Sequence, residues 1–172
     1  LVTEPANTLY RPPELLRRYL QDQALTPATC SVLVRRDAFE HTGLFEERFT
    51  GLYEDQAFFL KAYSKLPIYL LETCTDFYRQ HEYSHSAEAL RTGRYSAHEP
   101  TAALVGLFVW LTRYIVSQRM TDRIVWAGLL RKLTRLGLHR LMVVNRPARA
   151  FLVWWYRARA SSPAPGHRDG RN

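Results

Sequence analysis

The spacing of apolar residues in the first ninety positions predicts three helical segments. Pro12-Pro13 opens the first, over 14–23, in which leucines and a tyrosine recur on one face. Asp37 is expected to cap a single helical turn that Gly43 closes in a left-handed conformation. The third helix is predicted over 54–65, with one face in the core and the other in water. In this helix we expect Phe58, Phe59 and Ala62 to be buried and Lys61 and Lys65 to be exposed.

Short apolar runs between these helices predict strands. The first run, 30–34, is rich in β-branched residues and is read as a buried strand. Two more strands are predicted, over 68–71 and 76–80. Helices that alternate with strands indicate an α/β architecture for residues 1–90.

The pattern changes after Pro100, where apolar residues recur at helical spacing. Three helices are predicted, over 101–118, 121–137 and 139–159. The last contains an aromatic cluster, 151–156, with arginines on both sides. No stretch reaches the roughly 18 uninterrupted apolar residues of a membrane-spanning helix. Residues 161–172 are rich in Pro, Gly and Arg and are expected to be disordered. The predicted divisions are therefore 1–90, 91–160 and 161–172.

Charge is distributed unevenly between these regions. Residues 1–90 hold 9 Lys and Arg against 13 Asp and Glu, a balance of −4, and residues 91–172 hold 15 against 3, a balance of +12. The two balances sum to the net charge of +8. Such asymmetry predicts an anionic partner for the second region. Cys30 and Cys74 form no C-x-x-C motif, so they are expected to be small buried residues in a reducing, cytoplasmic setting. The chain begins with Leu1, and we expect it to be a section of a longer protein.

Glu54 and Asp55 are the most informative polar pair. They stand at a predicted loop-to-helix junction after Gly51, where a carboxylate can be held rigidly and still face a cleft. A carboxylate within about 2.6–3.2 Å of a hydroxyl can take its proton during attack. The dipeptide alone is explained more simply, because acidic residues are common at helix N-termini.

The surrounding motifs resemble the second half of family 2 glycosyltransferases, which have the GT-A fold. That family has a strand ending in paired arginines, a Gly-Gly-Phe-Asp/Glu-Glu turn, a Glu-Asp pair opening a helix, and Tyr-Arg-x-His with a trailing Ser. The corresponding segments here are Cys30-Ser-Val-Leu-Val-Arg-Arg36, Gly43-Leu-Phe-Glu-Glu47, Tyr53-Glu-Asp-Gln56 and Tyr78-Arg-Gln-His81, followed by Ser84 and Ser86. Their order and spacing match over about a third of the chain. The resemblance implies a partial, C-terminal GT-A fold followed by a helical extension.

The resemblance implies roles for four residues. Asp55 would be the base that activates an acceptor hydroxyl in an inverting, single-displacement transfer, and Glu54 would orient the acceptor or support Asp55. His81 would reach the donor diphosphate or a bound Mg²⁺ or Mn²⁺, which offsets charge on the leaving group. Arg79 would add to that, although pairing with Asp76 or Glu82 explains it equally well. The substrates would be a nucleotide-sugar donor and a glycan or lipid-linked acceptor.

Some family features are missing from the sequence. Leu44 replaces the second Gly of the turn, and no Asp-x-Asp motif, which in the family binds metal and donor, occurs in the 172 residues. The Gln-x-x-Arg-Trp motif of processive synthases is also absent, which favours a single addition. The chain alone is therefore expected to lack the donor-binding half and to be inactive.

A competing motif overlaps the same region. His81-Glu82-Tyr83-Ser84-His85 matches H-E-x-x-H, in which two imidazoles on one helical face bind zinc and the Glu activates water. Three fixed positions match often by chance, and the longer continuation H-x-x-G-x-x-H is missing. A zinc metallopeptidase is the alternative function.

The basic helical region offers a third interpretation. Tryptophans beside arginines favour the interface of an anionic membrane, which would place the protein in the cytoplasm at the inner face of the plasma membrane. The alternative is packing of these helices within the protein. A non-catalytic membrane-binding fragment therefore stays open. No recognised nucleic-acid motif accompanies the charge, so no nucleic acid is expected.

Overall fold

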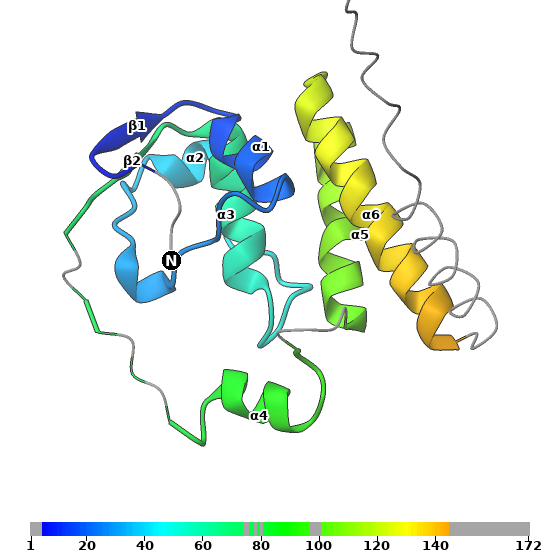
Figure 1. Ribbon diagram of the computed structural model, residues 1–172. Coiled ribbons are helices and arrows are strands. Elements are labelled where there is room, and N and C mark those ends of the chain that lie inside the picture. The colour runs from blue at the N-terminus through cyan, green and yellow to red at the C-terminus, as the bar shows by residue number, and fades with distance from the viewer. Residues whose placement is uncertain (1–4, 74–75, 78, 80, 97–100, 145–172) are drawn as a thin grey trace, which may run out of the picture. The chain divides into compact units, whose positions relative to one another are not determined.

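The computed structural model describes residues 5–73, 76–77, 79, 81–96 and 101–144, with side chains as far as Gly137. Residues 1–134 form one compact unit and residues 135–172 a second, and the last helix runs across the division between them. Figure 1 shows the elements in chain order. They are β1 (Thr8–Tyr10), α1 (Glu14–Leu20), a 3-10 turn (Thr29–Ser31), α2 (Ala38–Thr42), α3 (Glu54–Lys65), β2 (Ile68–Leu70), α4 (His85–Arg91), α5 (Ala102–Ser117) and α6 (Arg123–Val144).

The fold contains both helices and a sheet, as predicted, but helices dominate the described residues. The sheet consists of β1 and β2, which pair antiparallel with Thr8 opposite Leu70 and Tyr10 opposite Ile68. The strand predicted over 68–71 is thus confirmed as β2. Its partner β1 lies in a segment for which no strand was predicted.

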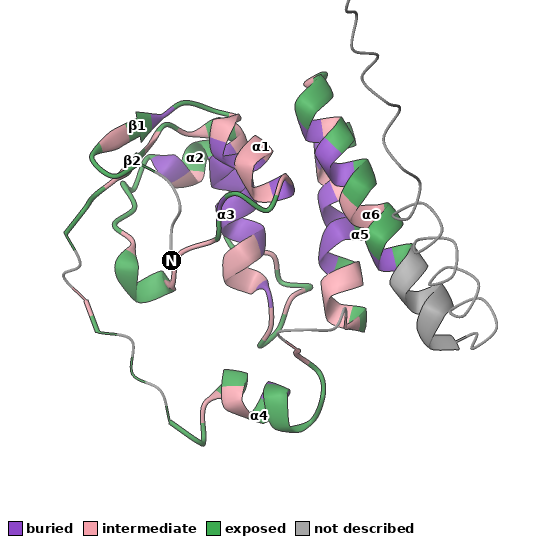
Figure 2. Ribbon diagram, in the orientation of Figure 1, coloured by how far each residue is buried: buried purple, intermediate pink, exposed green. Residues whose placement is uncertain are grey.

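Helix α3 is the centre of the first unit. Seven consecutive residues, Ala57 to Tyr63, are buried, so the helix is covered on all sides along this stretch. Helices α1, α2 and α5 pack against it, and its buried positions appear purple in Figure 2. The predicted burial of Phe58, Phe59 and Ala62 is confirmed. A helix buried all round gains hydrophobic stabilisation from every neighbour, about 25 cal/mol for each Å² of apolar surface removed from water.

Helix α6 approaches α1 closely at a glycine. A Cβ placed on Gly128 would lie 2.8 Å from the Cβ of Leu20, which no ordinary side-chain contact allows. Val125 and Leu129, which precede and follow Gly128 in α6, are also buried. Glycine therefore lets the first part of α6 join the core of the first unit.

The run 30–34 is not a strand, contrary to the prediction. Residues Thr29–Ser31 form a 3-10 turn, and the segment that follows has no strand partner among the described residues. Leu33 is fully exposed and Cys30 is exposed too, so the predicted burial of Cys30 is wrong. An apolar run becomes a strand only where another strand is available to pair with it. Cys74 lies outside the described residues.

Three other boundaries differ from the predictions. Helix α1 ends at Leu20 rather than at residue 23, because Asp22 takes a left-handed conformation with φ 62°. The strand predicted over 76–80 is absent at its described positions, and Phe77 is 98% exposed. The helices predicted over 121–137 and 139–159 are continuous from Arg123 to Val144. The aromatic cluster at 151–156, its neighbouring arginines and the tail 161–172 lie outside the described residues.

The predicted exposure of Lys61 is wrong, and that of Lys65 is confirmed. Lys61 is 3% exposed, and its ammonium group donates to the carbonyl of Leu44 and, at 3.0 Å, to Oε1 of Glu46. Lys65 is exposed and donates to the carbonyl of His41. Helical periodicity predicts that both lysines lie on the solvent-exposed face of the helix. The loop that folds over Lys61 is not visible to a periodicity argument.

No described helix combines the length and the apolar character that a membrane crossing requires.

Asp122 joins the beginning of α6 to α1. Its Oδ1 accepts from the amides of Ile124 and Val125, and its Oδ2 accepts from Nε of Arg17 at 3.0 Å. The hydrogen bond from Arg17, assisted by the helix amides, lowers the pKa of Asp122 below its ordinary value, and partial burial opposes this only in part. The carboxylate is therefore both a helix cap and half of an ion pair.

We expect Asp122→Ala to lower the free energy of unfolding at pH 7 by about 1–2 kcal/mol, because the cap and the ion pair are both lost. A lowered folded-state pKa stabilises the fold above the ordinary carboxyl pKa of about 4, and this contribution disappears as the pH falls through the folded-state pKa. The difference between wild type and variant should therefore shrink on acidification below about pH 4. Urea unfolding at a series of pH values measures both effects.

Contrary to the prediction, Asp37 precedes α2 without a capping hydrogen bond from its side chain, so Asp37→Ala is the matched control. It should change the free energy of unfolding by less than about 0.5 kcal/mol. An equal loss of unfolding free energy in the two variants would contradict the role of Asp122 as helix cap and ion-pair partner.

Candidate functional site

A strained turn places the first residues of α3. Gly51 has φ 77° and Tyr53, which precedes the helix, has φ 68° and ψ 6°. Left-handed conformations are uncommon for a bulky aromatic residue and cost of order 1–3 kcal/mol. Tyr53 is nevertheless buried, and its ring lies 6.2 Å from that of Tyr95. Burial raises the pKa of Tyr53, although a hydrogen bond with Thr101 opposes the shift. Packing therefore holds this turn in a conformation that its backbone does not favour.

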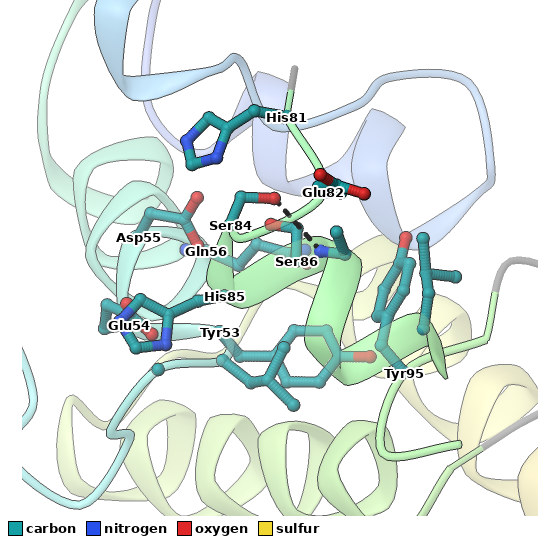
Figure 3. A pocket seen from close by; sticks show the side chains of 14 residues that line it. Tyr53, Glu54, Asp55, Gln56, His81, Glu82, Ser84, His85, Ser86 and Tyr95 are labelled. Atoms are coloured by element: carbon teal, nitrogen blue, oxygen red, sulfur yellow. Dashed lines mark hydrogen bonds between the residues drawn. The ribbon is translucent and has the colours of Figure 1, made fainter. Parts of the chain in front are cut away.

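A cleft of about 750 Å³ opens beside this turn. One wall is the turn and the first turn of α3, and the other is the segment that leads into α4, as Figure 3 shows. The lining residues are Gly51, Leu52, Tyr53, Glu54, Asp55, Gln56, His81, Glu82, Ser84, His85, Ser86, Ala87, Leu90 and Tyr95. Two motifs that are about 25 positions apart in the sequence, Tyr53–Gln56 and the region from His81, thus share one opening.

Asp55 lies in the first turn of α3 and is partly exposed to the cleft. Its Oδ1 accepts from the backbone amide of Gln56 at 2.7 Å, while Oδ2 forms no hydrogen bond with a described residue. The positive end of the helix dipole favours a carboxylate at this position. In Figure 3 the Asp55 carboxylate points toward the side of the cleft that holds His81. One oxygen is therefore fixed and the other is available to a ligand.

Glu54 lines the same cleft, and one of its carboxylate oxygens is buried. Its Oε2 is buried and has no hydrogen-bond partner among the described residues. Leaving a buried polar atom without a partner costs about 1–3 kcal/mol, so such atoms are rare in folded proteins.

His81 and His85 do not lie on one helix. Ser84 caps α4 by accepting from the amide of Ala87, so the helix begins at His85 and His81 precedes it in a turn. Figure 3 shows the two imidazoles in different parts of the cleft. The arrangement of H-E-x-x-H on one helical face, on which the peptidase alternative depends, is missing here.

Arg79 is less well placed than Asp55 and His81, and the predicted metal role of His81 finds no further ligands among the described residues. Arg79 is exposed, does not line the cleft, and forms no ion pair with a described residue. Asp76, its predicted alternative partner, accepts instead from the hydroxyl of Ser31 at 2.6 Å. Within the part of the chain that the structure describes, no three His, Cys, Asp or Glu side chains gather as a metal site would require. His81 alone does not make such a site.

A network behind the cleft supports α3, and sequence reasoning missed it. Lys61 pairs with Glu46, whose Oε2 accepts from the indole Nε1 of Trp110 in α5 at 3.2 Å. Phe45, beside Glu46, stacks on Phe58 of α3 with ring centres 4.8 Å apart. The Gly43–Glu47 motif is thereby fixed to α3 and α5. In the sequence, Glu46 and Lys61 are 15 positions apart in different predicted elements, and nothing in that spacing indicates that they pair.

Helix α1 contributes one contact close to the cleft. The hydroxyl of Tyr19 donates to Oε1 of Gln56 at 3.4 Å, and burial raises the pKa of Tyr19. Gln56 lines the cleft next to Asp55. The phenol is therefore a neutral donor that orients the Gln56 amide.

Comparison with protein-family models, with curated proteins and with solved structures finds no match to this chain.

We expect Glu46→Ala to lower the free energy of unfolding by about 3 kcal/mol, because it leaves a buried ammonium group without its carboxylate. Lys61→Met should lower the free energy of unfolding by less, about 1 kcal/mol, because it removes the buried charge and keeps an apolar side chain of similar size. Urea unfolding at neutral pH measures both. Glu47→Ala is the control, since Glu47 is exposed, and a loss equal to that of Glu46→Ala would contradict the network.

We expect Glu54→Met to raise the free energy of unfolding, by up to about 1 kcal/mol. The substitution removes a buried acceptor without a partner, and the lost helix-dipole interaction, about 0.5 kcal/mol, offsets part of the gain. Thermal unfolding in the absence of ligand measures the change. A lower melting temperature would show that Glu54 is a structural residue rather than one kept for a ligand.

Proposed function

We propose that this chain is the acceptor-side part of an inverting, family 2-type glycosyltransferase with a GT-A fold. In this proposal Asp55 is the general base for the acceptor hydroxyl. The observation that carries it is the position of Asp55, fixed in the first turn of α3 at the side of a cleft that His81 shares. A base of this kind must be held firmly and still be accessible to its substrate.

The charges in the cleft support an acceptor rather than a nucleotide diphosphate. Glu54, Asp55 and Glu82 contribute three carboxylates, while no Lys or Arg is among the described lining residues. Carboxylates accept hydrogen bonds from hydroxyl groups and repel phosphates. A sugar alcohol therefore fits this cleft better than a diphosphate does. Cationic groups for the donor would have to come from elsewhere, and Arg79 is not placed to supply them.

Glu54 and the tyrosines complete the acceptor site. Glu54 lines the cleft beside Asp55, and its carboxylate would accept from a second acceptor hydroxyl and so orient the ring. Tyr53 and Tyr95 contribute apolar ring surface to the same cleft. Sugars present both hydroxyl groups and apolar C–H faces, so this combination suits a glycan or lipid-linked sugar.

In this proposal a single displacement transfers the sugar. The acceptor hydroxyl attacks the anomeric carbon of the donor sugar while Asp55 takes its proton. A C–O bond forms to the acceptor, the bond from the anomeric carbon to the phosphate oxygen breaks, and the nucleoside diphosphate leaves with the electron pair. Attack opposite the leaving group inverts the anomeric centre. His81, which lines the same cleft, is the residue of this chain proposed to approach the departing diphosphate.

The test uses the full-length protein that contains this sequence, with membranes or glycans of its source as acceptor and a panel of radiolabelled nucleotide sugars as donors. Asp55→Asn keeps the shape of the side chain but cannot accept a proton, so transfer should fall about 10²–10⁴-fold while the chain stays folded. The loss should appear in kcat rather than in the KM for the donor.

Asp37→Asn is the matched control, because Asp37 is exposed and distant in sequence from the cleft residues. It should retain wild-type transfer. Transfer by Asp55→Asn at the wild-type rate would overturn the base assignment, and an absence of sugar transfer from every donor would overturn the proposed function.

A further inference from the structure

The connection between α5 and α6 carries exposed basic and apolar side chains that the proposed function does not use. We call it the hairpin tip and define it by Arg113, Val116, Arg119, Arg123 and Ile124. All five side chains are exposed, and Val116 and Ile124 are 58% and 45% exposed. They lie in the last turns of α5, the connection 118–122 and the first turn of α6, whose exposed start is green in Figure 2.

The hairpin tip carries three arginines whose charge is not offset by an ion pair among the described residues. Arg113, Arg119 and Arg123 form no ion pair with a described residue. Between Thr101 and Gly137 the sequence has a single acidic residue, Asp122. That carboxylate is 16% exposed and is already bound to Arg17 and to the amides of α6. The arginines therefore attract an anionic partner rather than a carboxylate of their own unit.

Apolar side chains are interspersed among these arginines. Val116 and Ile124 are β-branched aliphatic residues that gain nothing from exposure to water, and Met120 between them is half-buried. A nucleic acid or an acidic peptide would neutralise the arginines but would leave Val116 and Ile124 largely in water. A lipid surface accommodates both kinds of side chain, with the guanidinium groups at headgroup depth and the aliphatic groups at the acyl boundary.

We propose that the hairpin tip docks on an anionic phospholipid surface. Each arginine near such a surface contributes about 1 kcal/mol, which is about fivefold in affinity. The attraction weakens with salt, because the Debye length shortens. The inference does not depend on the proposed transferase activity, since none of its residues lines the cleft.

The experiment measures co-sedimentation of the whole chain with vesicles of phosphatidylcholine, with or without phosphatidylglycerol. The protein should bind the vesicles that contain phosphatidylglycerol and should dissociate at high salt. Replacing Arg113, Arg119 and Arg123 together with Gln should weaken that binding about 100-fold. Replacing Val116 and Ile124 together with Ser should weaken it at least about fivefold at unchanged net charge.

Two matched controls distinguish an effect of the hairpin tip from an effect of net charge or of total exposed apolar surface. Arg36, Arg48 and Arg91 are exposed arginines outside the hairpin tip, and their triple Gln variant changes the net charge equally. Leu9 and Leu25 are 50% and 58% exposed, and their double Ser variant removes similar apolar surface elsewhere. Both controls should bind like wild type. Equal loss in either control, or full binding by the arginine variant, would overturn the proposal.

Binding of single-stranded RNA, followed by fluorescence anisotropy, distinguishes the other anionic class. RNA binding that depends on the three arginines and not on Val116 and Ile124, without vesicle binding, would also overturn the proposal. Thermal unfolding of every variant confirms that each change acts on a folded chain.

Discussion

A buried ammonium group constrains the first unit more than any apolar contact does. Lys61 sits in the middle of α3 at 3% exposure, where an unpaired charge would cost several kcal/mol. The loop 44–46 must therefore fold over α3 to supply the Leu44 carbonyl and the Glu46 carboxylate. Glu46 in turn holds Trp110 of α5. One charge thus joins α3, this loop and α5 in a single geometry, which a purely apolar contact would not specify.

That rigid support explains how the cleft tolerates local unfavourable features. Tyr53 is left-handed, and Glu54 keeps a buried oxygen without a partner among the described residues. Each costs of order 1–3 kcal/mol, and both occur at the first turn of α3. Features of this kind persist where surrounding contacts outweigh them, and they are commonest at functional sites. The packed middle of α3 supplies those contacts one turn away from the strain.

The sequence predicted the features that depend on local pattern. Helix α3 and its buried Phe58, the turn closed by Gly43, and the strand β2 all follow from periodicity and turn chemistry. What it missed depends on contacts between distant residues: the pairing of Lys61 with Glu46, the exposure of Leu33, and β1 as partner of β2. For the site, the motifs identified Asp55 and His81, which share the cleft, but also Arg79, which does not line it. Spacing cannot show which exposed side chain faces an opening.

The distribution of charge separates the two surfaces of the first unit chemically. Acidic residues from two segments, Glu54 with Asp55 and then Glu82, meet in the cleft without a Lys or Arg among its described lining. In α5 and the first part of α6, the one acid is committed to Arg17, so the exposed arginines stay unneutralised. A hydroxyl-bearing ligand is therefore favoured at the cleft and an anionic one at the hairpin tip. Because the charges have opposite sign, the carboxylates of the cleft disfavour a strongly anionic ligand, and the exposed arginines attract one.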